Sequence, residues 1–141
     1  EALPILDEVT AALEAKRRHK DLFRYNFRRG QVAEAQGDVD GALAAYQKVF
    51  EFDATFVPNL VRLGRLHVRR ESWPDALKVF QTVLLHQTKL DTAGRVQVFH
   101  NLGLVRRAMG EARKARDMFN RALGLDPEHA ASREGLESLD L

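Results

Sequence analysis

The fold is decided by residues 60–84, which read LVRLGRLHVRRESWPDALKVFQTVL. Apolar residues recur at intervals of three and four on both sides of Glu71, which is the spacing of an amphipathic helix. Ser72 followed by Pro74 and Asp75 predicts the start of a second helix, because serine caps free amides, an early proline is tolerated and an acid favours the positive helix end. The stretch therefore predicts two helices joined by a short turn.

The same pattern of glycine, alanine, an aromatic residue and a small apolar residue occurs three times along the chain. Matching positions differ in number by 34 between the first two copies and by 39 between the last two, so five extra residues lie between Val83 and Phe99. Such a period indicates an array of repeated helical units. In each copy, glycine and alanine allow two helices to approach closely, and the aromatic side chain fills the space beside them. The copies are Gly30, Ala42, Tyr46 and Val49, then Gly64, Ala76, Phe80 and Val83, then Gly103, Ala115, Phe119 and Ala122.

The pattern resembles the tetratricopeptide repeat, a two-helix unit of about 34 residues with a large apolar residue, a Leu-Gly pair, an alanine, an aromatic residue and a closing proline. The first copy departs from it at Asn26 and Arg29, where apolar residues are usual. The resemblance covers about residues 23–129 and implies an all-α fold, a right-handed α-solenoid of helix-turn-helix hairpins with N- and C-terminal flanking helices. The second copy matches through Leu60, Leu63, Gly64, His67, Ala76, Phe80 and Val83, and the third through Phe99, Leu102, Gly103, Arg106, Ala115, Phe119, Ala122 and Pro127.

A single domain accommodates the whole chain of 141 residues. Asp91 is expected to cap the first helix of the third repeat, which then runs longer than usual from Thr92 to Met109. The expected boundaries are 1–22 for an N-terminal capping helix or decayed repeat, 23–56 for repeat 1, 57–90 for repeat 2, 91–129 for repeat 3 with its longer junction, and 130–141 for a C-terminal capping helix.

The N-terminal flank allows two interpretations. Ala12 and Ala15 match the second helix of a repeat at the same offset as the first two copies, which favours a decayed repeat. Glu8 stands at the alanine position and favours a specialised cap, which would cover the apolar end of the stack. In both cases a helix is expected, because apolar residues follow helical spacing at Leu3, Leu6, Val9 and Leu13.

Composition excludes several classes of protein. With 45% hydrophobic and 30% charged residues, the chain has the composition of a folded soluble protein. Its apolar runs are far shorter than the roughly 18 to 20 residues of a membrane helix, so no membrane insertion is expected in this segment. The absence of cysteine excludes disulfides and thiolate metal sites. We expect a cytoplasmic location, with the periplasmic side of an envelope protein as the alternative, and interpret the start at Glu1 as an excised or processed segment.

The residue inventory predicts a protein that is not an enzyme. There are only three serines, no cysteine and no glycine-rich phosphate loop, so we name no catalytic residue. None of the five histidines has the spacing of a metal site, and we expect neither metal nor cofactor. His67 lies where the repeat has a core aromatic residue, which favours packing.

The resemblance implies a binding site, because in this family the first helix of each repeat lines a concave surface. Arg62, Arg65 and Arg69 share one helical face there, and arginine binds carboxylates through two parallel hydrogen bonds. We therefore expect a protein or peptide partner with acidic and apolar side chains; the alternative is a solvated face or pairing with Glu34 and Glu71. The expected groove consists of Arg24, Phe27, Gln31, Arg62, Arg65, Arg69, Gln97, His100, Asn101, Leu104 and Arg107.

Some members of this family hold the terminal carboxylate of a chaperone peptide in a clamp of lysine, asparagine and arginine. The corresponding positions here do not reproduce that set, so binding to a chaperone tail is not expected. Those positions are Phe27, Gln31, Arg62, Gln97 and Asn101.

Two other functions remain open. Self-assembly into a homo-oligomer is possible through exposed end faces or the insertion at 86–95, close to the apolar residues Leu84, Leu85 and Leu90. Binding of nucleic acid is suggested by the basic cluster from Lys16 to Arg29. We rank nucleic acid lower, because few aromatic residues interleave with these bases and the charges nearly balance over the whole chain.

Overall fold

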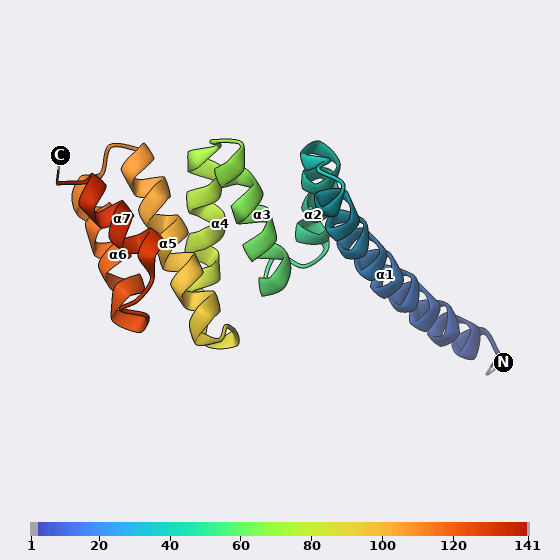
Figure 1. The fold of residues 1–141 in the computed structure, drawn as a ribbon. Coiled ribbons are helices and arrows are strands. Elements are labelled where there is room, and N and C mark those ends of the chain that lie inside the picture. The colour runs from blue at the N-terminus through green and yellow to red at the C-terminus, as the bar shows by residue number, and fades with distance from the viewer. Residues whose placement is uncertain (1–2, 141) are drawn as a thin grey trace. The chain divides into compact units, whose positions relative to one another are not determined.

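The computed structural model describes residues 3–140, with side chains from residue 8 onward, and every regular element in that range is a helix. The expected all-α class of helix-turn-helix hairpins is confirmed (Figure 1). The elements are α1 (Leu3–Ala35), α2 (Val39–Phe52), α3 (Val57–Arg69), α4 (Trp73–Leu85), the 3-10 helix η1 (Gln87–Lys89), α5 (Thr92–Ala108), α6 (Ala112–Leu125) and α7 (Ala130–Ser138).

The chain divides between Ala54 and Thr55 into two compact units. The first unit contains α1 packed against α2, which together hold the first copy of the repeat. The second unit contains the α3–α4 hairpin, the α5–α6 hairpin and α7, with α4 packed against α5 and α7 packed against both α5 and α6. No helix within residues 3–140 is both long and apolar enough to cross a membrane.

Close contact between glycine and an aromatic ring closes each hairpin. A Cβ atom added to Gly64 would lie 2.7 Å from Cζ of Phe80, and one added to Gly103 would lie 2.4 Å from Cε1 of Phe119. Gly30 has the same relation to Tyr46, and all three rings are fully buried. The sequence pattern therefore marks the closest approach of the two helices in every copy.

The turns inside the three hairpins share one backbone conformation. Gly37, Glu71 and Gly110 stand at the repeat offsets, and their φ angles are 77°, 58° and 79°. This left-handed region suits glycine, which has no Cβ, and is uncommon for other residues. Glu71 adopts it because the α3–α4 turn has the same geometry as the other two.

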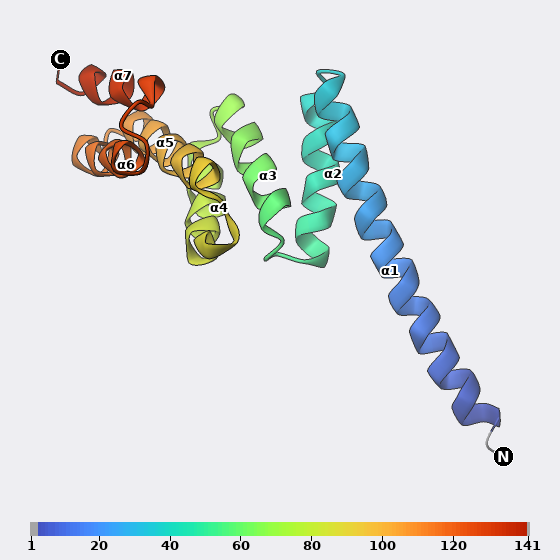
Figure 2. The same ribbon diagram turned by 60° about the horizontal axis from the view of Figure 1, so that its bottom comes forward.

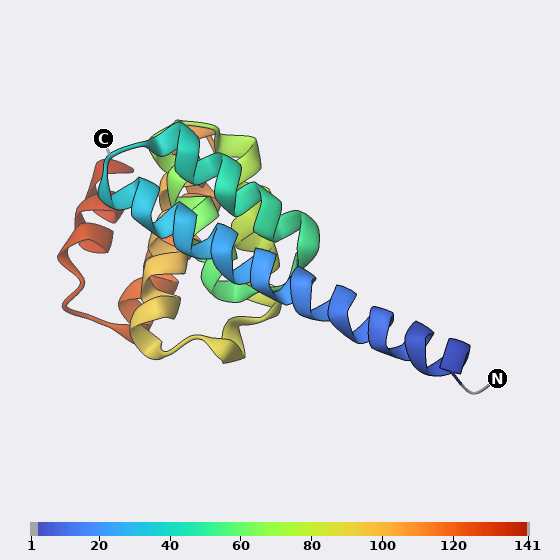
Figure 3. The same cartoon turned by 90° about the vertical axis from the view of Figure 1, so that its right-hand side faces the viewer.

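The N-terminal flank, expected as a capping helix or a decayed repeat over 1–22, does not form a helix of its own. Residues 3–22 and the first helix of repeat 1 form one continuous helix, α1, because no glycine or proline interrupts the chain between Ile5 and Arg29. Every side chain from Glu8 to Leu22 is exposed, so this segment covers no core in the first unit. The expected apolar pattern also includes Leu3 and Leu6, whose side chains lie outside the described residues. Figures 2 and 3 show α1 running past the end of α2 (Figure 2, Figure 3).

The five extra residues form a defined junction between α4 and α5. The junction contains the three residues of η1, which is attached to α5 by a hydrogen bond of 3.2 Å from Nε of Arg95 to the backbone oxygen of Gln87. The carboxylate of Asp91 accepts a hydrogen bond of 2.7 Å from the amide of Gly94, as expected for a helix cap. The resulting α5 has 17 residues against 13 in α3. The longer helix and its cap were both predicted.

Candidate functional site

A cavity of about 490 Å³ lies between α3 and α5 in the second unit. Val61 and Arg65 line it from α3, and Gln97 lines it from α5 together with Ala93 and Gly94 of the first turn. Arg65 and Gln97 were both expected in the groove. The structure thus brings residues of two successive repeats together, as expected for first helices that line one surface.

Two arginines of α3 are open to binding. Arg65 and Arg69 are exposed, four residues apart on a helix of 13 residues, and Arg62 is half-buried one turn before them. Within residues 3–140, the side chains of Arg65 and Arg69 make no hydrogen bond or ion pair, whereas Arg62 has interactions of its own. Internal pairing with acids therefore does not account for Arg65 and Arg69.

The last helix covers part of the expected groove. Nη1 of Arg107 donates a hydrogen bond of 2.8 Å to Oγ of Ser138, and Nδ1 of His100 lies 3.1 Å from Oγ of Ser132. Gly135 contacts the ring of Phe119, where an added Cβ would lie 2.6 Å from the ring. We expected His100 and Arg107 to be available to a partner. Their side chains instead hold α7 in place, because α7 lies along α5 as the first helix of a following repeat would.

A small polar cluster forms where α7 begins. Ser132 is fully buried, and its Oγ lies 2.7 Å from Nδ1 of His129 and 3.1 Å from Nδ1 of His100. The centroids of the two imidazole rings are 5.3 Å apart. Burial lowers the pKa of His100, and the neighbouring His129 and Arg107 lower it further. His100 is therefore held in its neutral form as a packing group.

The expected groove residues of the first unit have mixed roles. The ring of Phe27 lies 5.9 Å from that of Tyr46, and the hydroxyl of Tyr46 donates a hydrogen bond to the carboxylate of Glu34. These side chains stabilise the α1–α2 hairpin. Arg24 is exposed and Gln31 is half-buried, and both remain groove candidates of the first unit.

The remaining groove residues lie on α5. Nδ2 of Asn101 donates a hydrogen bond of 2.9 Å to the backbone oxygen of Gln97, and Leu104 is half-buried. Sequence reasoning missed Ala93 and Gly94, which line the cavity because the longer α5 begins earlier than α3 does. The longer offset between the second and third copies was the signal that could have indicated them.

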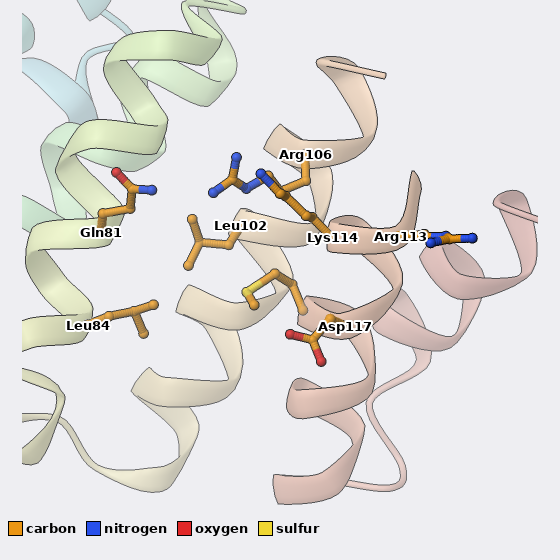
Figure 4. A pocket seen from close by; sticks show the side chains of 8 residues that line it. Gln81, Leu84, Leu102, Arg106, Arg113, Lys114 and Asp117 are labelled. Carbon is orange, nitrogen blue, oxygen red and sulfur yellow. The ribbon is translucent and has the colours of Figure 1, made fainter. Parts of the chain in front are cut away.

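A second cavity of the same unit, of about 280 Å³, lies between α4, α5 and α6. Figure 4 shows Leu84 pointing toward Leu102, with Arg106 and Lys114 on one rim (Figure 4). These two bases lie 3.1 and 3.0 Å from the carboxylate of Glu111. The hydrogen bond from Lys114 and the charge of Arg106 lower the pKa of Glu111, which stays ionised. Because two of the three bases that line it are already paired with Glu111, this cavity is a weaker candidate than the α3–α5 surface.

Comparison with known proteins gives the family and the fold. A family model described as tetratricopeptide repeat matches residues 57–128, and another of the same description matches residues 6–54. In sequence, the chain is similar to the protein CTR9 homolog of Arabidopsis thaliana, with 29% identity over 113 residues, which are 80% of this chain and 10% of that protein. The chain thus spans about a tenth of that relative's length.

Two solved structures are similar to the chain over most of its length. The MamA protein matches with a TM-score of 0.74 and 25% identity, covering 85% of this chain and 63% of that one. The second TPR domain of human RPAP3, solved in complex with an HSP70 peptide, matches with a TM-score of 0.72 and 17% identity, covering 87% and 98%. The second likeness concerns the fold alone.

Proposed function

Because the chain belongs to the tetratricopeptide repeat family, we propose that it is a protein-interaction scaffold whose second unit binds a partner peptide along α3 and α5. The observation that carries the proposal is the open cavity beside Arg65, together with two arginines that have no partner among residues 3–140. This repeat is an interaction module rather than a catalytic fold, and we propose no enzymatic activity.

The chemistry of the surface defines the partner. Two exposed guanidinium groups bind carboxylates, and the side chains of Val61 and Leu104 offer apolar contacts. We therefore propose a segment with acidic and apolar residues. The peptide complex of the RPAP3 domain supports a peptide as the class of ligand. The carboxylate clamp of chaperone-binding members is not reproduced at Gln97 and Asn101, so we propose a different acidic segment.

Charge reversal on α3 tests this function. Partners captured by crosslinking to the full chain would be reduced to synthetic peptides, and their affinity measured by fluorescence anisotropy. We expect the double variant Arg65→Glu with Arg69→Glu to weaken binding at least about tenfold, since each lost charged hydrogen bond is worth roughly 1.5 to 3 kcal/mol.

The matched control is Lys78→Glu with Arg113→Glu, which makes the same change of charge at exposed positions of α4 and α6. That variant should bind like the unchanged chain. Equal affinity of all three proteins would rule out the α3–α5 surface.

A second candidate, self-association, is favoured by one observation. Leu85 at the end of α4 is 82% exposed, next to the junction of η1. Sedimentation at micromolar concentrations tests it, with Leu85→Ser as the variant that should restore a monomer. A chain that is monomeric throughout this range would remove the candidate.

A further inference from the structure

One stripe of α1 continues beyond the helix that covers it. Residues at alternating intervals of four and three, from Val9 through Leu13, Lys16 and Lys20 to Phe23 and Phe27, form what we call the inner stripe. Phe23 lies against Phe52, the last residue of α2, with ring centroids 5.5 Å apart. Beyond that contact the stripe is uncovered in the first unit, where Val9 is 52% and Leu13 is 59% exposed.

A cavity of about 820 Å³ marks the point where α2 ends and the inner stripe becomes open. Leu13 and Phe52 supply its apolar surface, and Lys16, Arg17 and Lys20 surround them, with Glu51 as the only acid that lines it. Its volume lies within the range of about 300 to 1,000 Å³ that is typical of ligand sites. The cavity belongs to the first unit and shares no residue with the α3–α5 surface.

The charges around this cavity are unbalanced. Residues 16–29 contain seven bases and a single acid, Asp21. Of these bases, Arg18 lies 3.8 Å from Glu14, while the side chains of the others make no hydrogen bond or ion pair with the side chains described from residue 8 to residue 140. Such a concentration of cations on one helix attracts anionic groups and accelerates their association.

We propose that the open part of the inner stripe is a second docking site, and that it receives an acidic amphipathic helix of a partner protein. α2 already shows how a helix packs on this stripe, one or two turns further along α1. A bound helix would place apolar side chains on Leu13 and Phe52 and carboxylates beside Lys16 and Lys20, in the helix-in-groove mode of recognition.

The same observations disfavour other occupants. A second copy of α1 would bring Lys16 and Lys20 of one inner stripe against the same bases of the other, and like charges in contact destabilise an interface. Single-stranded nucleic acid needs open aromatic faces for stacking. The ring of His19 already stacks on Phe52 at a centroid distance of 5.7 Å, and Phe23 packs on the same ring. The exposed side chains of Val9 and Leu13 are apolar and have no donor or charge that could bind a phosphate.

The test uses the full chain and a synthetic helical peptide of five turns, with leucines at intervals of three and four and glutamates flanking them. A second peptide carries lysine in place of every glutamate. Fluorescence anisotropy should show that the acidic peptide binds at least about tenfold more tightly than the basic one. The affinity of the acidic peptide should fall about tenfold in the variant Lys16→Glu plus Lys20→Glu, and several-fold in Leu13→Ser. The lysine peptide should gain affinity for the charge-reversed variant.

The matched control reverses two bases on the opposite side of the same helix. Arg18 and Arg29 lie roughly half a turn away from the inner stripe, so Arg18→Glu with Arg29→Glu changes net charge equally without touching the cavity. This variant should keep its affinity, and so should Arg65→Glu with Arg69→Glu, which separates this site from the function proposed above. Circular dichroism verifies that each variant keeps its helices.

Several results would overturn the proposal. Failure of the acidic peptide to bind the unchanged chain is one, and equal weakening by the control variant is another, since it would show attraction to the overall charge. Sedimentation that gives dimers lost on Lys16→Glu plus Lys20→Glu would assign the site to a second copy. Tighter binding of single-stranded RNA than of the peptide, with the same sensitivity, would assign it to nucleic acid.

Discussion

α1 and α5 are the same helix of the repeat, yet their stacking faces differ in burial. Val98, Leu102 and Val105 of α5 are at most 2% exposed, and α5 packs against α4 of the preceding hairpin as well as against α6 and α7. The residues at the same repeat positions of α1 are Tyr25, Arg29 and Val32; Tyr25 is 61% and Val32 is 47% exposed. The comparison shows that the repeat pattern specifies how a hairpin closes on itself, whereas a neighbouring hairpin determines which outer face becomes core.

The largest expected effect on stability comes from truncating residues at one repeat position in α5 and in α1. Leu102→Ala should reduce the free energy of unfolding by roughly 3 kcal/mol, because it leaves a cavity beside α4. Arg29→Ala, at the same repeat position on α1, should change it by less than about 0.5 kcal/mol. Urea denaturation followed by circular dichroism measures both. Similar losses for the two variants would mean that the α1 face is covered as well.

A smaller effect on stability is expected when the pH is lowered, and it concerns the second unit. Burial lowers the pKa of His100 below its ordinary value of 6.5, so the unfolded chain binds its proton more readily. The contribution of neutral His100 to the free energy of unfolding is then fully present above pH 6.5, and it declines as the pH falls below that value. His67 acts in the same direction, because burial lowers its pKa more than the charge of Asp75 raises it.

Thermal melts between pH 7.5 and 5.5 should therefore show a fall in melting temperature that is reduced in His100→Gln. The first unit lacks a buried histidine among its described residues, and hydrogen exchange should show little change there. A fall of the same size in His100→Gln with His67→Gln would contradict the assignment.

The smallest expected effect distinguishes the turns. Glu71→Gly should raise the free energy of unfolding by roughly 0.5 to 1 kcal/mol, since glycine removes the strain of the left-handed conformation that Gly37 and Gly110 adopt freely. Glu71→Ala removes the charge but keeps the Cβ, so it should give no gain. Denaturant titration of the three proteins resolves the difference. A stability gain in the alanine variant would point to charge rather than backbone strain.

Much of the fold could be predicted because its determinants are local. Gly30, Gly64 and Gly103 pair with aromatic residues a fixed distance along the chain, and the helix caps and turns are encoded within a few residues. The length of α1 was missed, because the boundary expected after residue 22 is not a helix end. No single residue in the sequence signals that the helix continues there. The C-terminal helix expected at 130–141 is present as α7, but its packing along α5 was missed, because Gly135, which contacts Phe119, follows Gly103 at a spacing slightly shorter than the repeat period.

The candidate site was predicted only in part for the same reason. Arg65 and Gln97 border one cavity because each projects inward from a regular first helix, which periodicity alone predicts. The side chains of His100 and Arg107 contact α7 instead of lining the groove. These contacts are made with serines almost a whole repeat further along the chain, which periodicity does not predict. The apolar spacing through Val9 and Leu13 was predicted, but not that these residues are uncovered, because the length of α2 relative to α1 decides where the open part of the inner stripe begins.

The start of α7 depends on a single hydroxyl proton. Nδ1 of His129 caps this helix by accepting from the amide of Ser132 at 3.3 Å, so that nitrogen carries no hydrogen and can also accept the proton of the serine hydroxyl. The serine oxygen is then left to accept from Nδ1 of His100, which fixes opposite tautomers in the two rings. The caps of α2 and α5 are carboxylates, which have no tautomers, so among these three side-chain caps only that of α7 depends on where a ring proton lies.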